Sequence, residues 1–294
     1  LSPFLLQAVA KREPNPVSRF RDHFLRRAQF DAASWYHRVA AALVGNHVDD
    51  ATLSSVEKIV EQAGPDASTE ESEAEDVQRQ LDEFHAANVQ SLSKIILQSA
   101  GKGSGYLVLN PLSFNRRVVV DLPDAANPPV AEGVIKAVQF DEHRKSVVVD
   151  VPGSGFAWIA IPDEAMPPKV SKVPIAEHGL LQNEFFQVHI SETTGCFSQF
   201  KEHGRIPNRL SQQLASRFPN EQTLEVNKGE EGEEPKERRT YYSEMRSNSL
   251  EVTSDGPAMG EIVTKGDLID QQNDKRLAGF RQVFRVWRGK PTLE

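Results

Sequence analysis

The sequence contains one cysteine, Cys196, among its 294 residues. A single cysteine excludes an internal disulfide and any zinc or iron–sulfur site built from several thiolates. The cellular compartment stays open, because secreted proteins can also lack disulfides. Cys196 follows Gly195 in a β-rich segment, where a small buried residue is expected, so we interpret it as structural.

An excess of positive charge and a long apolar run are also missing. The 34 Lys and Arg residues against 42 Asp and Glu residues give a net charge of -8. A chain with this balance has no surplus cations to neutralise phosphates, so nucleic acid is not an expected partner. No stretch approaches the roughly 18 consecutive apolar residues of a membrane-spanning helix, and the N-terminus lacks the layout of a signal peptide. We therefore expect a soluble chain with no membrane partner.

The composition that is present, 38% apolar and 26% charged, is typical of a folded protein long enough for two or three domains. The chain begins at Leu1, without an initiator methionine, and ends soon after a strand-like run at residues 283–287. Both features indicate a piece of a longer protein.

Apolar side chains recur at helical spacing in three segments near the N-terminus. Residues 17–44 form the longest segment, and Gly45 supplies a stop signal because glycine tolerates the left-handed conformation that ends helices. A shorter segment starts near residue 50 and ends before Gly64. The third segment, residues 77–96, follows an acidic run that suits a helix N-terminus. Together the segments predict a three-helix bundle.

The spacing of aromatic residues in the first predicted helix indicates that they pack in the core of this bundle. At 100° per residue, Phe24 and Trp35 point within about 20° of each other. We therefore expect Trp35 to be buried against Phe84 or Leu92 of the third helix. The apolar stripe of the first helix consists of Val17, Phe20, Phe24, Trp35, Val39 and Leu43.

From Tyr106 the pattern changes to short β-rich runs. Several runs between residues 106 and 161 predict a small β-sandwich, and the proline-rich residues 162–174 predict an extended linker. Residues 180–200 predict a β-hairpin, and the charged residues 227–239 predict a solvated loop. An antiparallel sheet is expected to continue through residues 249–253, 260–264 and 279–287.

The expected fold class is therefore α+β with several domains. We place the three-helix bundle at residues 1–104 and the small β-sandwich at residues 105–173. The remaining residues, 174–294, are expected to form the N-terminal part of a larger β-sandwich domain.

No catalytic or metal-binding constellation stands out. The histidines are scattered singly, without the His-x-His or His-x-x-x-His spacing that lets two ligands share one ion, and we interpret them as surface or helix-seam residues. Runs of carboxylates are typical of solvated faces, and a Gly-x-Ser-x-Gly nucleophile elbow is missing. We assign no catalytic residue and no metal ligand. The histidines are His23, His37, His47, His85, His143, His178, His189 and His203.

Two adjacent aromatic residues, Tyr241 and Tyr242, are the candidates for contact with carbohydrate. A tyrosine ring can stack on the apolar face of a sugar. Because adjacent residues of a strand face opposite sides, we expect one ring to pack inward and only the other to be available.

Two segments carry a resemblance to a known family. Residues 107–117 read Leu-Val-Leu-Asn-Pro-Leu-Ser-Phe-Asn-Arg-Arg, and residues 181–188 read Leu-Gln-Asn-Glu-Phe-Phe-Gln-Val, with Thr-Gly at 194–195 and Phe-Ser at 197–198. They are similar to the openings of the β region and of the large C-terminal β domain in glycoside hydrolase family 38, the α-mannosidases. Residues 277–289 resemble a later strand pair of the same domain.

The resemblance implies a middle helical domain, a small β-sandwich and part of a galactose-mutarotase-like β supersandwich. For an intact relative it implies retaining hydrolysis with a carboxylate nucleophile, an acid/base carboxylate and a zinc ion that binds sugar hydroxyls. The zinc ligands and the nucleophile of such enzymes belong to an N-terminal α/β domain that has no counterpart in this sequence, and the usual His-His-Asp segment is also missing. We therefore expect no cofactor in this chain, and zinc only in an intact parent.

The leading hypothesis is a non-catalytic helical and β portion of an α-mannosidase-like glycoside hydrolase that supports a site for mannose-containing glycans. Its partner would be the missing N-terminal catalytic domain. The alternative is a non-catalytic carbohydrate-binding or structural protein made of the same modules. The activity of the parent, the linkage cleaved, the oligomeric state and the localisation, with the cytoplasm as one option, stay open.

Overall fold

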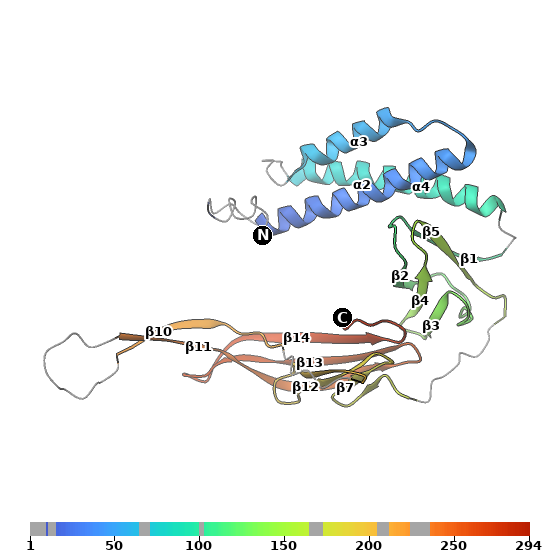
Figure 1. The fold of residues 1–294 in the computed structure, drawn as a ribbon. Helices are drawn as coiled ribbons and strands as arrows, with labels where there is room; N and C mark the ends of the chain where they lie inside the picture. The colour runs from blue at the N-terminus through green and yellow to red at the C-terminus, as the bar shows by residue number, and fades with distance from the viewer. Residues whose placement is uncertain are drawn as a thin grey trace. The chain divides into compact units, whose positions relative to one another are not determined.

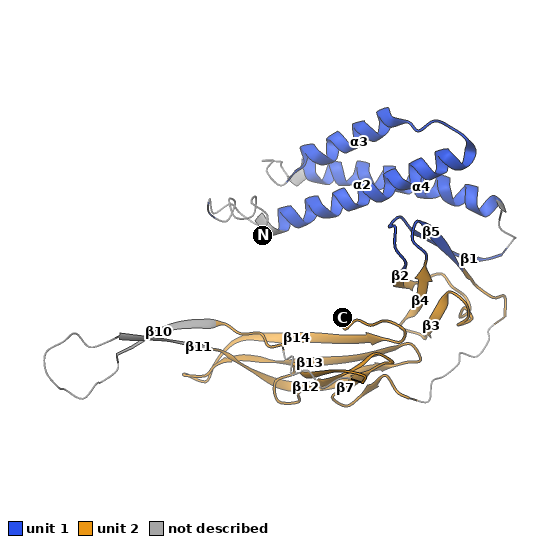
Figure 2. Ribbon diagram, in the orientation of Figure 1, with its two compact units in different colours: residues 1–116, 152–158 blue, residues 117–151, 159–294 orange. Residues whose placement is uncertain are grey.

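The computed structural model describes residues 10, 16–64, 71–99, 103–164, 173–204, 212–223 and 236–294. The chain forms two compact units, coloured in Figure 2. The helical unit comprises residues 1–116 and 152–158, and the β unit comprises residues 117–151 and 159–294. Helices and antiparallel strands together make the fold α+β, as expected. The division into three domains stays a prediction.

The helical unit contains the three expected helices (Figure 1). The first, α2, ends where the glycine signal placed it, and Gly45 adopts a φ of 73°. Asp49 caps α3 by accepting a hydrogen bond from the Thr52 backbone N–H at 3.1 Å. No helix in the described ranges has the length and apolar character that a membrane span needs. The bounds are α2 Pro16–Val44, α3 Asp50–Gln62 and α4 Glu71–Ser99.

Two apolar clusters hold the helices together. Phe30, Val60 and Leu81 join α2, α3 and α4, and the Phe30 ring stacks on Phe84 at 6.4 Å between centroids. The second cluster lies further along α2 and α4, and its buried members are Tyr36, Ala40 and Leu92.

The apolar stripe expected on α2 is wrong at two of its positions, Phe24 and Leu43, and the side chain of Val17 lies outside the described residues. Phe24 is 62% exposed and Leu43 is 58% exposed. At 100° per residue Phe24 points about 120° away from Phe30, so it leaves the seam that α3 and α4 cover. Trp35 does pack against the cluster that contains Leu92, but its side chain is half-buried rather than buried. The buried row on α2 is Phe30, Ala33, Tyr36 and Ala40.

A two-stranded sheet of β1 (Gly105–Asn110) and β5 (Gly155–Ala160) adjoins the helices in the same unit. Leu109 of β1 packs against the Tyr36–Leu92 cluster. Asn110 is 3% exposed, and its amide nitrogen donates to the Phe114 and Pro152 carbonyls at 2.9 and 3.0 Å. This amide therefore fixes the connections at one end of the small sheet.

The β unit contains antiparallel sheets of two, three and four strands. Strands β2, β4 and β3 form one three-stranded sheet, and β6 to β9 form a four-stranded meander. Strands β12 to β14 form the longest sheet, and β10 pairs with β11. The bounds are β2 Arg116–Asp121, β3 Ile135–Phe140, β4 Lys145–Val151, β6 Ala176–Glu177, β7 Leu180–Gln182, β8 Phe186–Ile190, β9 Phe197–Glu202, β10 Arg217–Thr223, β11 Lys236–Tyr242, β12 Glu244–Asp255, β13 Met259–Asp270 and β14 Lys275–Trp287.

The hairpin expected around Gly195 is confirmed, because β8 pairs antiparallel with β9 and Gly195 has a φ of 73°. The loop expected at residues 227–239 is wrong at its end, since residues 236–239 belong to β11. Residues 227–235 of that loop, and residues 165–172 of the expected linker, lie outside the described residues.

The core of the β unit forms where the sheets meet. Ile175, Leu181 and Val188 from the β6–β9 region pack against Ile262 and Phe284 from the β12–β14 sheet. A second cluster joins β3 and β4 to the C-terminal sheet, and its largest member is Trp287, which is 1% exposed.

Candidate functional site

A groove of about 510 Å³ lies between the C-terminal half of α2 and the neighbouring part of α4. It exists because α3 is short. Helix α3 starts beside Arg38, whose guanidinium is 3.5 Å from the Asp50 carboxylate, and then runs back along α2. Of the described helices, none packs as a third helix against the last turns of α2, and polar side chains fill the rim. The polar lining includes His37, Asn46, His47, Asp49, Asn88 and Lys94.

His37 and Asn88 link α2 to α4 at one wall of the groove. The His37 Nδ1 and Asn88 Oδ1 atoms are 3.0 Å apart, and the Asn88 amide nitrogen donates to the Phe84 carbonyl at 2.8 Å. Because that nitrogen is used, Oδ1 faces the ring, and Nδ1 of His37 must be the donor. The other ring nitrogen, Nε2, is buried and has no hydrogen-bond partner among the described residues. In the tautomer with its proton on Nδ1, the ring has an unused acceptor, Nε2, inside the seam.

Opposite charges stand on the two sides of this groove. Asp49 accepts hydrogen bonds from the Thr52 hydroxyl at 2.6 Å and the Thr52 N–H at 3.1 Å. These hydrogen bonds from Thr52 lower the pKa of Asp49, so it is ionised at neutral pH. Lys94 is exposed and forms no ion pair within the described part of the chain. The groove can thus donate to and accept from a polar ligand, but it contains no nucleophile paired with a base.

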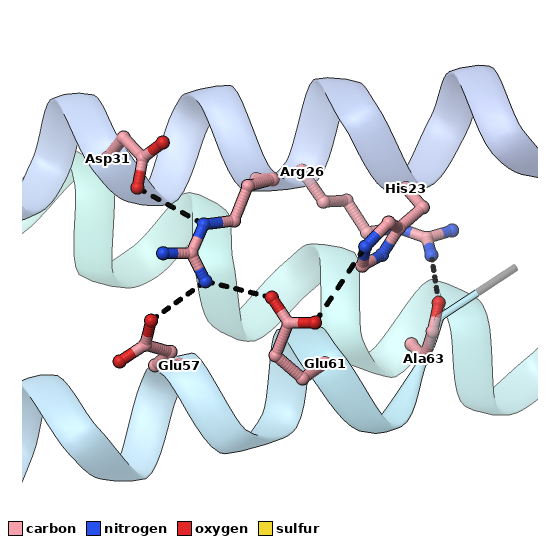
Figure 3. Close-up of polar contacts among 7 residues, drawn as sticks. His23, Arg26, Asp31, Glu57, Glu61 and Ala63 are labelled. Atoms are coloured by element: carbon pink, nitrogen blue, oxygen red, sulfur yellow. Dashed lines mark hydrogen bonds and ion pairs between the residues drawn. The ribbon is translucent and has the colours of Figure 1, made fainter. Parts of the chain in front are cut away.

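A second polar cluster joins α2 to α3, as Figure 3 shows. The Arg27 guanidinium lies 2.8 Å from both the Glu57 and the Glu61 carboxylates and 3.2 Å from Asp31. His23 Nε2 is 3.9 Å from the other oxygen of Glu61, and Arg26 donates to the Ala63 carbonyl at 3.2 Å. The two glutamates are turned toward one guanidinium, so they do not form a free carboxylate pair for glycoside hydrolysis. We interpret this cluster as the polar attachment of α3.

Zinc, which the resemblance implies for an intact parent, does not fit the described residues. Among them, no three His, Cys, Asp or Glu side chains come together in a way that could hold a metal ion. Cys196 is buried, its sulfur lies 3.2 Å from the Met245 sulfur, and burial raises the pKa of its thiol. A thiol in that state is neither a nucleophile nor a metal ligand at neutral pH.

The two candidate sugar-contact residues lie at the end of β11. Tyr242 pairs in register with Arg217, and its side chain is 53% exposed. Tyr241 pairs with Phe218, but the position of its side chain lies outside the described part of the structure. The role of both tyrosines stays a prediction.

The fold is similar to the crystal structure of an alpha-mannosidase from Enterococcus faecalis V583, with a TM-score of 0.52 and 12% sequence identity. The similarity covers 92% of this chain and 40% of that chain. This chain therefore spans less than half the length of the enzyme that it matches. No protein-family description and no curated protein matches the sequence. The similarity is one of fold: this chain resembles part of that alpha-mannosidase in the arrangement of its helices and strands.

The His37–Asn88 pair is the feature that sequence reasoning missed. The two residues are 51 positions apart and belong to no motif. One local signal was present, because Asn88 lies seven residues after Leu81 and four before Leu92, on the buried row of α4. A polar residue on such a row needs a partner, and a histidine on the facing helix supplies it.

Proposed function

We propose that this chain is the helical and β portion of an α-mannosidase-like glycoside hydrolase, acting on α-mannosides or related glycans. In this proposal the chain supports the carbohydrate site, and the catalytic groups belong to another part of the parent. The observation that carries the proposal is the fold similarity to an alpha-mannosidase across 92% of this chain but only 40% of that enzyme. The order of helices first and β-sheets second agrees with the family 38 resemblance.

The two asparagines of the resembling motifs support the proposal through their structural roles. Asn110 fixes the turns beside β1 and β5, as described above. Asn183 is 8% exposed, accepts hydrogen bonds from the backbone of Phe185 and Phe186, and donates to the carbonyls of Trp287 and Lys290. Each motif thus contains a buried asparagine whose side-chain amide hydrogen-bonds backbone groups and holds them in place. This gives the asparagine of each motif a structural role in the fold.

The chemistry of the proposed parent is retaining hydrolysis, and zinc would bind sugar hydroxyls there. We place that ion outside this chain, because the described residues hold no ligand set for it. The part assigned to this chain is mechanical. It would support the carbohydrate site and position the adjoining catalytic domain.

The full reading frame that encodes these residues tests the proposal. We expect an adjoining α/β region with paired His and Asp ligands and an Asp nucleophile. Elemental analysis of the purified chain should find no stoichiometric zinc, whereas the intact parent should hold the ion. A reading frame without such a region, or one tightly held zinc per isolated chain, would contradict the assignment.

The alternative, a non-catalytic carbohydrate-binding protein, has one observation in its favour. The α2/α4 groove offers both donors and acceptors, including Asp49 and Lys94, without catalytic groups. Titration of methyl α-mannoside into the isolated chain, followed by NMR, distinguishes the readings. Saturable shifts at His37 and Lys94 that disappear in Lys94→Ala would favour the binding module, and unchanged spectra would favour the enzyme portion.

A further inference from the structure

The α2/α4 groove has a third wall, the connection of residues 45–49 between α2 and α3. This connection returns along α2, because the Asp50 carboxylate, at the start of α3, lies 3.5 Å from the Arg38 guanidinium. The Asn46 N–H donates to the Ala41 carbonyl at 2.9 Å and fixes the first end of the connection, and the N-cap hydrogen bond of α3 fixes the other end. The groove is therefore preformed by the helical unit itself.

Helices α2 and α4 run in the same direction along this groove. Their contacts pair Phe30 with Phe84 and His37 with Asn88, so the residue numbers rise together on the two helices. Asn88 thus marks on α4 the level of His37 on α2. Lys94 follows Asn88 by six residues, which places it about 9 Å further along the helix axis.

A carboxylate and an ammonium group therefore stand near opposite ends of the groove. Asp49 stays close to the level of His37, because the residue after it contacts Arg38, the neighbour of His37 on α2. Lys94 lies toward the other end, where Val44 of the last turn of α2 also lines the groove. The two ends thus carry charges of opposite sign.

Neither charge is neutralised within the described part of the chain. The Asp49 carboxylate accepts hydrogen bonds from Thr52, an uncharged residue, and no cation of the described residues pairs with it. Lys94 is exposed, and none of the described carboxylates pairs with it. The adjacent Asp50 and Arg38 instead pair with each other. A ligand that carries both signs of charge would complement both ends at once.

The α2 wall between these charges is apolar. It consists of Ala40, Ala41 and Val44, which share one face of the helix through their spacing of three and four residues. On α4, Ile95 continues the apolar surface, and Ser91 stands one helical turn before it. The alanine side chains are small and leave room for a narrow ligand, and apolar surface favours methylene groups over water.

We propose that this groove binds a small zwitterion whose ammonium and carboxylate groups are separated by a chain of methylene groups. The ammonium pairs with Asp49, the carboxylate pairs with Lys94, and the methylene groups lie on the apolar α2 wall. The volume of about 510 Å³ is that of a small-molecule site. A neutral sugar, the ligand of the alternative function above, supplies neither charge. The inference is independent of the proposed enzymatic parent, because every lining residue belongs to the helical unit.

Three probes of equal chain length test the proposal on the whole chain. ε-Aminocaproate carries both charges, caproate lacks the ammonium, and hexylamine lacks the carboxylate. By NMR titration at neutral pH we expect saturable shifts of the backbone amides of Ala41, Asp49 and Lys94 with ε-aminocaproate. Its dissociation constant should be at least about threefold lower than that of either singly charged probe, and the difference should shrink at high salt.

Two substitutions test the two ends of the groove separately. Asp49→Asn removes the charge but keeps an N-cap residue for α3. It should weaken the binding of ε-aminocaproate and hexylamine by at least about threefold and leave that of caproate unchanged. Lys94→Gln should weaken the binding of ε-aminocaproate and caproate and leave that of hexylamine unchanged. Lys58→Gln, at an exposed lysine on α3, is the matched control and should bind all three probes as the original chain does.

Four results would overturn the proposal: equal binding of the three probes, no saturable shift, shifts confined to residues outside the groove, or unchanged affinity for ε-aminocaproate in either charge variant. None of them bears on the reading-frame test of the enzymatic parent, so the two proposals fail separately.

Discussion

In the helical unit, the seam between α2 and its neighbouring helices contains both apolar and polar side chains. In the β unit, by contrast, buried polar side chains hydrogen-bond backbone groups and hold them in place. Four buried polar atoms of α2 lack partners among the described residues: His23 Nδ1, Arg26 Nε, Ser34 Oγ and His37 Nε2. The β unit has no such atom in its described part. Its buried amides are used instead, as when Gln139 accepts from the backbone of Ala258 and Met259 at 3.2 and 3.1 Å.

Stability against unfolding and the freedom of polar groups to rearrange therefore differ between the two units. An unsatisfied buried polar atom costs about 1–3 kcal/mol, so the seam of the helical unit has less margin against unfolding. The same atoms could hydrogen-bond a ligand or water at no further desolvation cost. In the β unit the buried amide side chains already hydrogen-bond backbone groups, so they have little freedom to rearrange.

The largest effect is expected from Trp287→Ala in the β unit. The side chain is 1% exposed and joins β3 and β4 to the C-terminal sheet. Its removal should lower the free energy of unfolding of the β unit by about 3–5 kcal/mol, because a large cavity remains. Chemical denaturation monitored by hydrogen exchange of β13 measures this, and Leu277→Ala, at 39% exposure, is the control that should be nearly neutral.

Asn183→Ala tests whether the hydrogen bonds of a buried amide side chain stabilise the β unit. Its four hydrogen bonds, at 2.8 to 3.1 Å, would be lost together. We expect the β unit to lose about 2–4 kcal/mol of unfolding free energy, because buried backbone groups are left unsatisfied. Asn248→Ala removes an exposed amide bonded to Asp267 and should change the midpoint of denaturation little. An equal loss of unfolding free energy in both variants would contradict this role of the buried amide.

Trp35→Ala tests the apolar part of the helical seam. Because the side chain is half-buried against the Tyr36–Leu92 cluster, the expected loss is about 2 kcal/mol, less than for a buried aromatic residue. Circular dichroism at the helical band during thermal unfolding measures it. Phe24→Ala, which removes a ring that is 62% exposed, should leave the melting temperature nearly unchanged. The core position of Trp35 would be contradicted by an equally small effect of both substitutions.

How far the sequence predicts this fold depends on whether the signal is local. The end of α2 at Val44 and the turn at Gly195 follow from glycines with positive φ, so both were predicted closely. Strand β12 runs from Glu244 to Asp255, beyond the predicted 249–253, because polar residues such as Arg246 also pair along the sheet. Their incorporation depends on β13, which no local pattern reveals.

The candidate site was less predictable for the same reason. Burial of Phe24 depends on which part of α2 the neighbouring helices cover, and periodicity alone does not contain that information. The groove arises from the short length of α3 relative to its neighbours, and the His37–Asn88 pair joins two helices far apart in sequence. Only the polar Asn88 on an apolar row gave a hint.

The smallest expected effect is the response of the helical unit to mild acid. Burial beside Tyr36 lowers the pKa of His85, and the Asp82 carboxylate opposes this only partly. Because its pKa is lower in the folded than in the unfolded chain, His85 contributes stability that is complete above about pH 6.5 and is lost as the pH falls through the folded value. Melting curves of the helical unit between about pH 7 and 5 measure this. His85→Gln should have a shallower pH dependence, and an unchanged slope would contradict this cause.

Turnover of an aryl α-mannoside tests the central claim most directly. The purified chain and its intact parent are to be assayed side by side, each with and without added zinc. The account predicts hydrolysis by the parent and none by the chain, because the described residues contain neither a metal site nor a nucleophile with a base. Hydrolysis by the isolated chain that disappears when one of its own carboxylates is replaced would contradict it.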